Sequence, residues 1–353
     1  MTPLLFRHQR GLTLVELMVA MTLGLLVMIG VSNIFIANSA TFRMADNLAG
    51  AQENGRMAFE MISREIREAG GNPCGAQIIV NALNPVAGGT VSTSPWLAWN
   101  APIQGYDSSS SGDDANSLVP VGTASTNRLA GTDAILLVTG NSSQNLTIAK
   151  HQPSAASMQL SNSNHGLKSG DIVMACNYKD ATVFQITNAS NGSATIVHNT
   201  GSVTPGNCTK GLGWRDPSKQ NCTKPTSYLE DFTGGSVVSF KPGFWYIGRN
   251  DRGGSSLYRY SPNDKLAEEM VENVTNMQIK YLLKESGKAP NTSYVDGTTT
   301  NVSDWTTSAS KQVIATQITL TVTTKDAIST DTPPKQLTSD MYATIQIRAR
   351  ESL

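Results

Sequence analysis

The sequence lacks the short motifs on which common enzyme families depend. None of the patterns G-x-S-x-G, H-E-x-x-H, the P-loop or the dinucleotide-binding G-x-G-x-x-G is present. The four histidines, His8, His151, His165 and His198, are far apart in the sequence. We expect each of them to lie in a loop or at the surface, and we expect no catalytic site.

The chain also lacks a charge imbalance. Lys and Arg together number 27, as do Asp and Glu, so the formal net charge is zero. A strongly basic chain would attract polyanions through its electric field, and this one has no such field. We therefore expect no nucleic-acid partner, and the sequence gives no indication of a cofactor.

A convincing metal-binding loop is missing as well. Acidic and hydroxyl residues between Asp107 and residue 117 surround Gly112 in a pattern similar to a calcium loop. Aspartates are absent from the third and fifth positions, and Leu118 occupies the twelfth, where a glutamate is needed. We predict a solvated, flexible loop over 107–117 and no metal site, with ion binding as the alternative.

Cysteine pairs in C-x-x-C spacing are absent. The four cysteines, Cys74, Cys176, Cys208 and Cys222, all follow a long apolar segment, which suits an oxidising compartment. We favour a disulfide between Cys208 and Cys222, because it would close a short loop that looks unable to fold alone. Cys74 with Cys176 then follows by elimination, although four cysteines allow three pairings and free buried thiols are a further alternative.

The N-terminal part has almost no charge after its first ten residues. From Gly11 to Phe42 the one ionisable side chain is Glu16, whereas Arg7 and Arg10 precede this stretch. The apolar run is long enough to cross a bilayer as a helix, and its basic flank places its start in the cytoplasm. No A-x-A-like site for an ordinary signal peptidase follows, so we expect an anchor with the remaining chain outside.

The sequence GLTLVEL, from Gly11 to Leu17, resembles the signature of type IV prepilins. The resemblance implies that a prepilin peptidase removes residues 1–11 as a leader and methylates the new N-terminus at Leu12. Glu16 then becomes the fifth residue of the mature chain, and the resemblance implies that it pairs with the Leu12 amine of a neighbouring subunit and sets the register of assembly. A carboxylate in an apolar span is costly and is usually retained for a partner. The alternative is a simple membrane anchor whose Glu16 reaches the lipid headgroups.

The helical pattern continues beyond the apolar run, and we predict one helix over residues 12–71. Gly70 and Gly71, followed by Pro73, predict its end. Apolar residues recur at spacings of three and four, and charged residues occupy another face that we expect to be solvated. The apolar positions are Met44, Leu48, Ala51, Gly55, Ala58, Ile62, Ile66 and Ala69, and the charged ones are Asp46, Glu53, Arg56, Glu60, Arg64 and Glu68.

We predict that residues 72–353 form an extracytoplasmic, β-rich globular head. Short β-branched and aromatic runs within 131–200 indicate a β-rich subregion, and a second group between 237 and 348 predicts the main antiparallel sheet. The fold class is therefore α+β, with the long N-terminal helix packed on an antiparallel sheet and a β-rich insertion. The predicted strands are 134–139, 145–148, 171–175, 182–187, 194–197, 237–240, 244–247, 257–260, 277–283, 313–323 and 341–348.

Two stretches, residues 65–71 (EIREAGG) and 167–187, look like the PilW family of minor pilins. This resemblance implies a low-abundance subunit that primes pilus assembly or lies near the pilus tip, with roles in twitching motility or adhesion. The implied partners are the prepilin peptidase, the inner-membrane assembly platform, other minor pilins, the major pilin and a tip adhesin. The implied location is the bacterial inner membrane, with one span and the head in the periplasm, and then the extracellular pilus. The alternatives are a J-type pseudopilin of type II secretion and a surface adhesin carried on a pilin stem.

Overall fold

The computed structural model of the chain describes residues 13–71, 78–83, 95–97, 101–108, 118–190, 192–200, 204–213, 228–285, 287–298, 302, 305, 310–328, 332–333 and 335–348. It divides the chain into two compact units. The first comprises Met1–Ala51 with Thr324–Leu337, and the second comprises Gln52–Thr323 with Thr338–Leu353.

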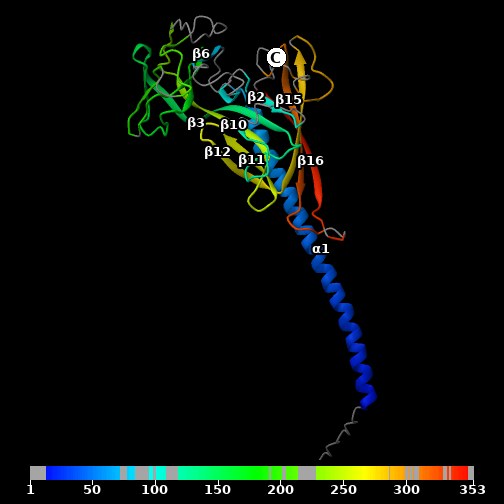
Figure 1. The fold of residues 1–353 in the computed structure, drawn as a ribbon. Helices are drawn as coiled ribbons and strands as arrows, with labels where there is room; N and C mark the ends of the chain where they lie inside the picture. Colours follow the sequence, from blue (N-terminus) through cyan, green and yellow to red (C-terminus); the bar gives the residue numbers. More distant parts are fainter. Residues whose placement is uncertain are drawn as a thin grey trace, which may run out of the picture. The chain divides into compact units, whose positions relative to one another are not determined.

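A single helix, α1 (Leu14–Glu68), begins in the first unit and ends in the second (Figure 1). The helix ends as predicted, because Gly70 has a φ of 68°, a left-handed conformation that costs glycine little. The Gly71 N–H donates to the Glu68 carbonyl at 2.9 Å and closes the last turn.

The second unit contains a ten-stranded sheet with the core order β1-β6-β5-β10-β3-β4-β7. β11 pairs with β10, β12 pairs with β11, and β2 pairs with β3. All of these pairs are antiparallel except β1 with β6, which is parallel. The strands are β1 (Ile78–Asn81), β2 (Ile103–Tyr106), β3 (Ala134–Gln152), β4 (Ser157–Leu160), β5 (Ile172–Cys176), β6 (Asp180–Gln185), β7 (Thr195–Val197), β10 (Ser236–Arg249), β11 (Ser255–Ser261) and β12 (Leu266–Glu272).

A separate four-stranded antiparallel sheet has the order β14-β13-β15-β16. Its strands are β13 (Val274–Glu285), β14 (Val295–Asp296), β15 (Lys311–Thr323) and β16 (Thr338–Gln346), and β15 and β16 lie side by side in Figure 1. A short pair of β8 (Leu212–Gly213) with β9 (Tyr228–Leu229), and the 3-10 turns η1 (Pro95–Leu97) and η2 (Pro153–Ala155), complete the described elements.

The α+β class is confirmed, but the predicted grouping of the strands is wrong. β10, β11 and β12 do not join β13, β15 and β16 in one main sheet, because β10 lies between β5 and β3. Strands of the predicted insertion and of the predicted main sheet therefore share one sheet. Alternation of apolar and polar residues identifies a strand and its buried face, but it does not identify the neighbouring strand.

Most predicted strands are present, and several extend further than predicted. Two pairs of predicted strands are each part of one continuous strand. The ranges 134–139 and 145–148 both lie in β3, and the ranges 237–240 and 244–247 both lie in β10. β12 was missed because its sequence, LAEEMVE, has three glutamates and no regular alternation. β1, β2, β4 and β14 were also missed, and each has four residues or fewer.

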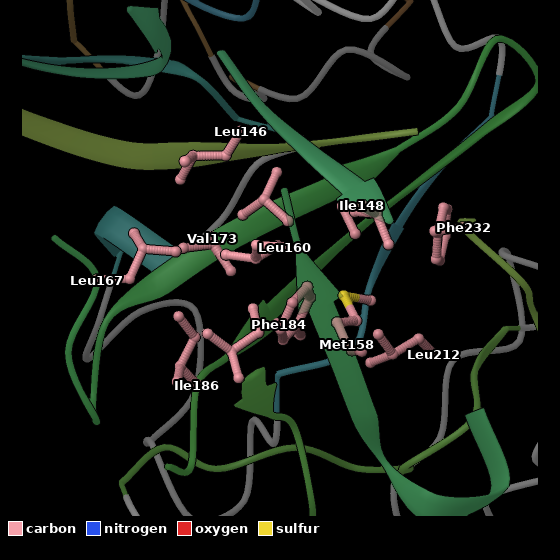
Figure 2. Close-up of a cluster of buried hydrophobic side chains, with 14 residues drawn as sticks. Leu146, Ile148, Met158, Leu160, Leu167, Val173, Phe184, Ile186, Leu212 and Phe232 are labelled. Carbon is pink, nitrogen blue, oxygen red and sulfur yellow. The ribbon is translucent and has the colours of Figure 1, made fainter. Parts of the chain in front are cut away.

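The core of the ten-stranded sheet includes a cluster of buried side chains from β3, β4, β5 and β6 (Figure 2). Phe184 of β6 and Phe232, which follows β9, are both fully buried in this cluster. Interiors of this kind are packed as densely as organic crystals, so each side chain is held by its neighbours. Polar groups inside the cluster consequently need partners nearby.

Asp133, immediately before β3, ties the two large sheets of the second unit together. Its Oδ2 accepts the Ile279 N–H of β13 at 2.8 Å, and its Oδ1 accepts the Ser108 N–H at 2.9 Å. Its own N–H donates to the Met277 carbonyl at 2.9 Å. Burial raises the pKa of Asp133 to about 6, although the two N–H donors act in the opposite direction.

We predict that Asp133→Ala lowers the free energy of unfolding by about 1–3 kcal/mol, because the buried Ile279 N–H loses its acceptor. Urea unfolding followed by tryptophan fluorescence measures this change. Asp296→Ala is the matched control, since the Asp296 carboxylate pairs with Lys280 at 3.6 Å where both side chains are about half exposed, and its change should stay within about 0.5 kcal/mol. Equal effects of the two substitutions would contradict the role given to Asp133.

Candidate functional site

The N-terminal half of α1 is the most unusual surface of the chain. Residues 14–38 are all exposed, although nearly all are apolar, and Glu16 is the one ionisable residue among them. This helix is long and apolar enough to cross a membrane. Burial of a large apolar side chain contributes about 1.5–3 kcal/mol, so this surface strongly favours lipid or other protein over water.

Thr13 and Glu16 form the start of this helix. The Thr13 Oγ1 accepts the Glu16 N–H at 3.3 Å, and the Thr13 carbonyl accepts the Leu17 N–H at 3.1 Å. Thr followed three residues later by Glu is the sequence of a capping box, a helix-start signal that our sequence analysis missed. Gly11 and Leu12, the predicted cleavage site, lie outside the described residues.

The C-terminal part of α1 is held by the second unit along the predicted apolar stripe. Gly55, Ala58, Ile62, Ile66 and Ala69 are all buried, which confirms this part of the prediction. A Cβ on Gly55 would collide with Met341 of β16 and lie 3.3 Å from Val322 of β15. The helix therefore approaches the four-stranded sheet closely at this glycine. The predicted charged residues of this part, Glu53, Arg56, Glu60, Arg64 and Glu68, are exposed as expected.

Glu65 fastens the same part of the helix to the ten-stranded sheet. Its Oε2 accepts the Trp245 Nε1–H of β10 at 2.6 Å, and its Oε1 accepts the Arg259 Nε–H of β11 at 2.7 Å. The Glu65 and Arg259 side chains are only 20% and 16% exposed, so solvent weakens this ion pair less than a surface one. No local sequence pattern reveals the role of Glu65, because its partners are 180 and 194 residues away.

The first unit contains a contact between α1 and the segment that connects β15 to β16. The Asn47 Nδ2–H donates to Asp326 Oδ2 at 3.2 Å, and the Asp326 N–H donates to Asn47 Oδ1 at 3.1 Å. The ends of the segment are joined, since the Thr324 N–H donates to the Leu337 carbonyl at 2.9 Å. Two reciprocal hydrogen bonds thus fix this connection against the helix.

The expectation that each histidine lies in a loop or at the surface is wrong for His151, which lies in β3 and is buried. His198 lies in the loop after β7, as expected, but it is buried as well. The two rings are buried and meet with their Nε2 atoms 3.0 Å apart. His151 Nδ1 accepts the Phe232 N–H at 3.1 Å, so the neutral ring carries its proton on Nε2 and donates it to His198 Nε2. His165 is also buried, with its Nδ1 accepting the Leu167 N–H at 3.0 Å, whereas His8 lies outside the described residues.

The His151–His198 pair belongs to the core and not to an open cavity. Phe232 stacks on His151, and Phe184 meets His198 edge-on (both phenylalanines are labelled in Figure 2). Burial lowers the pKa of His151 to about 4, against the opposing effect of the Asp231 carboxylate 3.9 Å away. Burial and the neighbouring His151 lower the pKa of His198 to about 3. Both rings are therefore neutral at pH 7, and no nucleophile adjoins them among their described contacts.

Neither a metal site nor a catalytic arrangement emerges from the described residues. No group of three or more histidine, cysteine, aspartate or glutamate side chains is close enough to hold a metal ion in this part of the chain. A cavity of about 220 Å³ is lined by Asp171, Lys241, Arg259 and Asp264 among others, but by no histidine. The loop 107–117, considered for an ion in the sequence analysis, lies outside the described residues beyond Ser108.

Cys176 and Cys208 are both disulfide-bonded. Cys176 ends β5, and Cys208 follows β7. Cys74 and Cys222 lie outside the described residues, so the pairings Cys74 with Cys176 and Cys208 with Cys222 stay a prediction.

We predict that Glu65→Gln loosens α1 from its sheet, because the amide loses the charge on which the Arg259 contact depends. The free energy of unfolding should fall by about 1–3 kcal/mol, measured by urea denaturation in detergent. Glu60→Gln is the control, since its contact with Arg64 is 3.7 Å long and both side chains are largely exposed. A loss no larger than that of the control would contradict the role of Glu65.

We predict that acid weakens the head through the His151–His198 pair. Because the folded pKa values are depressed, the unfolded chain binds more protons as the pH falls below 6.5, and stability decreases from there towards pH 4 by up to about 1.4 kcal/mol per pH unit and histidine. Asp133 acts in the opposite direction between pH 6 and 4, because its folded pKa is raised. Urea midpoints measured from pH 7 to 4 on the wild type and on His151→Asn/His198→Gln isolate the pair. The double variant, whose amides do not titrate, should show a flatter decline, and identical slopes would contradict this account.

Comparison with protein families identifies two parts of the chain. Residues 6–32 match the prokaryotic N-terminal methylation motif, and residues 244–350 match the type IV pilus-assembly protein W family. The second match confirms the resemblance to the PilW family. It covers neither residues 65–71 nor residues 167–187, the two stretches that carry this resemblance in the sequence. No curated protein and no solved structure matches the chain. The methylation motif at one end and the PilW region at the other support a structural, pilin-type protein associated with the type IV pilus.

Proposed function

We propose that the chain is made as a prepilin, loses residues 1–11 after Gly11, is methylated at Leu12, and then enters a pilus as a priming or tip-proximal subunit. The observation that carries the proposal is the exposed apolar surface of α1 with Glu16 as its one ionisable residue, in the region that matches the methylation motif. A helix of this kind is stable in a membrane before assembly and among other helices afterwards. The head would lie in the periplasm and then outside the cell.

Glu16 is proposed to set the register between subunits. Cleavage after Gly11 creates an ammonium group at Leu12, and a carboxylate in apolar surroundings is far less costly when a cation adjoins it. Within one chain, the Glu16 N–H already donates to Thr13 Oγ1 at the helix start. The Glu16 carboxylate would accept the Leu12 amine of a neighbouring subunit, and this pair would stabilise one axial position over others.

The large β-rich head supports a role at a pilus end over a repeating role along the fibre. The two sheets and their loops occupy most of the second unit, whereas bulk fibre subunits are usually smaller. The proposed partners are the prepilin peptidase, the inner-membrane assembly platform, other minor pilins and the major pilin, with a tip adhesin as a further partner. Twitching motility and adhesion are the proposed processes, since the PilW match favours a pilus over a secretion pseudopilus.

The first test is mass spectrometry of the N-terminal peptide from sheared surface fibres and from the remaining envelope. N-methylated Leu12 in the fibres is the expected result, and the same peptide confined to the envelope would limit the protein to priming. An intact Met1, or a cut at another bond, would overturn the proposal.

We predict that Gly11→Ala retains the leader, whereas Glu16→Ala permits its removal but lowers the amount of the chain in fibres by about tenfold or more, as expected when a charge pair of about 1.4 kcal/mol is lost. Thr22→Ala is the matched control in the same apolar helix, since Thr22 Oγ1–H donates to the Val19 carbonyl within its own turn. Normal incorporation of Glu16→Ala would remove the register role, and equal loss with Thr22→Ala would assign the effect to the helix itself.

A further inference from the structure

β16 presents a free edge of the four-stranded sheet. It is the last strand of the order β14-β13-β15-β16, and all nine of its residues, Thr338–Gln346, pair with β15 on one side without a register shift. Among the described strands, none pairs with its other side. A regular edge strand of this length carries a row of backbone N–H and C=O groups to which another strand can add.

The other edge strands of the described sheets are protected against the addition of another strand, and β16 is not. β1, β2, β7 and β14 have four residues or fewer. β12 has seven residues and three charged side chains, Glu268, Glu269 and Glu272, of which the last two pair with Arg252. Charged side chains along an edge strand oppose strand addition. β16 contains neither proline nor lysine, and its one charged residue, Asp340, accepts a hydrogen bond from Thr321 Oγ1 of the neighbouring β15 at 2.7 Å. The devices that usually block edge pairing are therefore absent from this strand.

The two faces of β16 are also different. Met341 faces α1, because its sulfur lies against Gly55 of the helix, and Ile345 is buried. Tyr342 lies on the opposite face and is 78% exposed, flanked by the exposed Asp340 and Thr344. The strand is thus fixed from one face by its own helix, while Tyr342 on the other face is exposed and no described strand occupies its outer edge.

We infer that β16 is the docking edge for a β-strand of a different pilus subunit, which extends the four-stranded sheet by one strand. The inference rests on the proposed function, because it requires that the chain assembles with other subunits. Backbone hydrogen bonds would supply most of the attraction, and Tyr342 would contact a side chain of the added strand, since aromatic cross-strand pairs are favourable.

A second copy of this chain fits the edge less well in a pilus. Two identical β16 strands pair antiparallel about a two-fold axis, with Tyr342 opposite Tyr342, and this symmetry reverses one head relative to the other. Subunits that leave the same membrane all point in one direction, so a different subunit with its own strand satisfies the geometry without that reversal.

The test is photo-crosslinking in cells that make pili. p-Benzoylphenylalanine replaces Tyr342 in the full-length chain, and replaces Tyr178, an exposed tyrosine between β5 and β6, in the control. The expected result is a cross-link from position 342, and not from 178, to a strand peptide of another protein that has its own N-terminal methylation motif. Cross-links from 342 to the same chain alone would replace this partner with a second copy, and no cross-link above the control would overturn the inference.

A second experiment distinguishes the loss of docking at the β16 edge from a general defect in assembly. Tyr342→Lys/Thr344→Lys adds charge along the edge at exposed positions, and Leu266→Lys adds it at an exposed position on the edge strand β12. The first variant should lower the amount of the chain that co-purifies with its cross-linked partner or with sheared fibres by about tenfold, whereas the second should leave it unchanged. Leader removal should be normal in both. If the wild-type chain kept its leader, the proposed function would be contradicted. If the wild type lost its leader and the double-lysine variant co-purified with the partner and the fibres to the same extent, only the docking edge would be contradicted.

Discussion

The whole structure depends on the contrast between the two parts of one helix. From Leu14 to about residue 38 the helix has no covered face, and its apolar side chains have no favourable environment in water. From Gly55 to Ala69 a stripe of small and branched residues is buried by the head's own sheets. The apolar surface of the first part favours lipid or other protein over water, and the second part has already been covered by the chain itself.

The C-terminal part of the helix is attached to the head by apolar packing and by the Glu65 carboxylate. The close approach at Gly55 brings the helix against β15 and β16, and Glu65 binds Trp245 and Arg259 of the other sheet. Asp133 then joins the two sheets to each other through backbone N–H groups. The C-terminal part of the helix is therefore tied to both sheets by short contacts.

The polar groups inside the head serve structure. His151 and His198 are neutral, hydrogen-bonded to each other, and enclosed by Phe184 and Phe232. The cavity of about 220 Å³ has charged residues of both signs but none of these rings. The apolar helix, Glu16 and the β16 edge are the surfaces at which we propose that other subunits bind.

The sequence by itself determined the long helix, its end at Gly70, its buried stripe, the prepilin motif and the α+β class. These features are local: they depend on hydrophobicity, on spacings of three and four, and on residues next to one another in the chain. Only the tertiary structure decided which strands share a sheet, that β10 joins β3 and β5, that His151 meets His198, and that Glu65 finds partners 180 and 194 residues away. An alternating pattern indicates that one face of a strand is buried, but it does not indicate which element covers that face. A single charged or imidazole side chain in the sequence does not indicate which distant residue it contacts. Those pairings are set by the packing of the whole head, which no local pattern encodes.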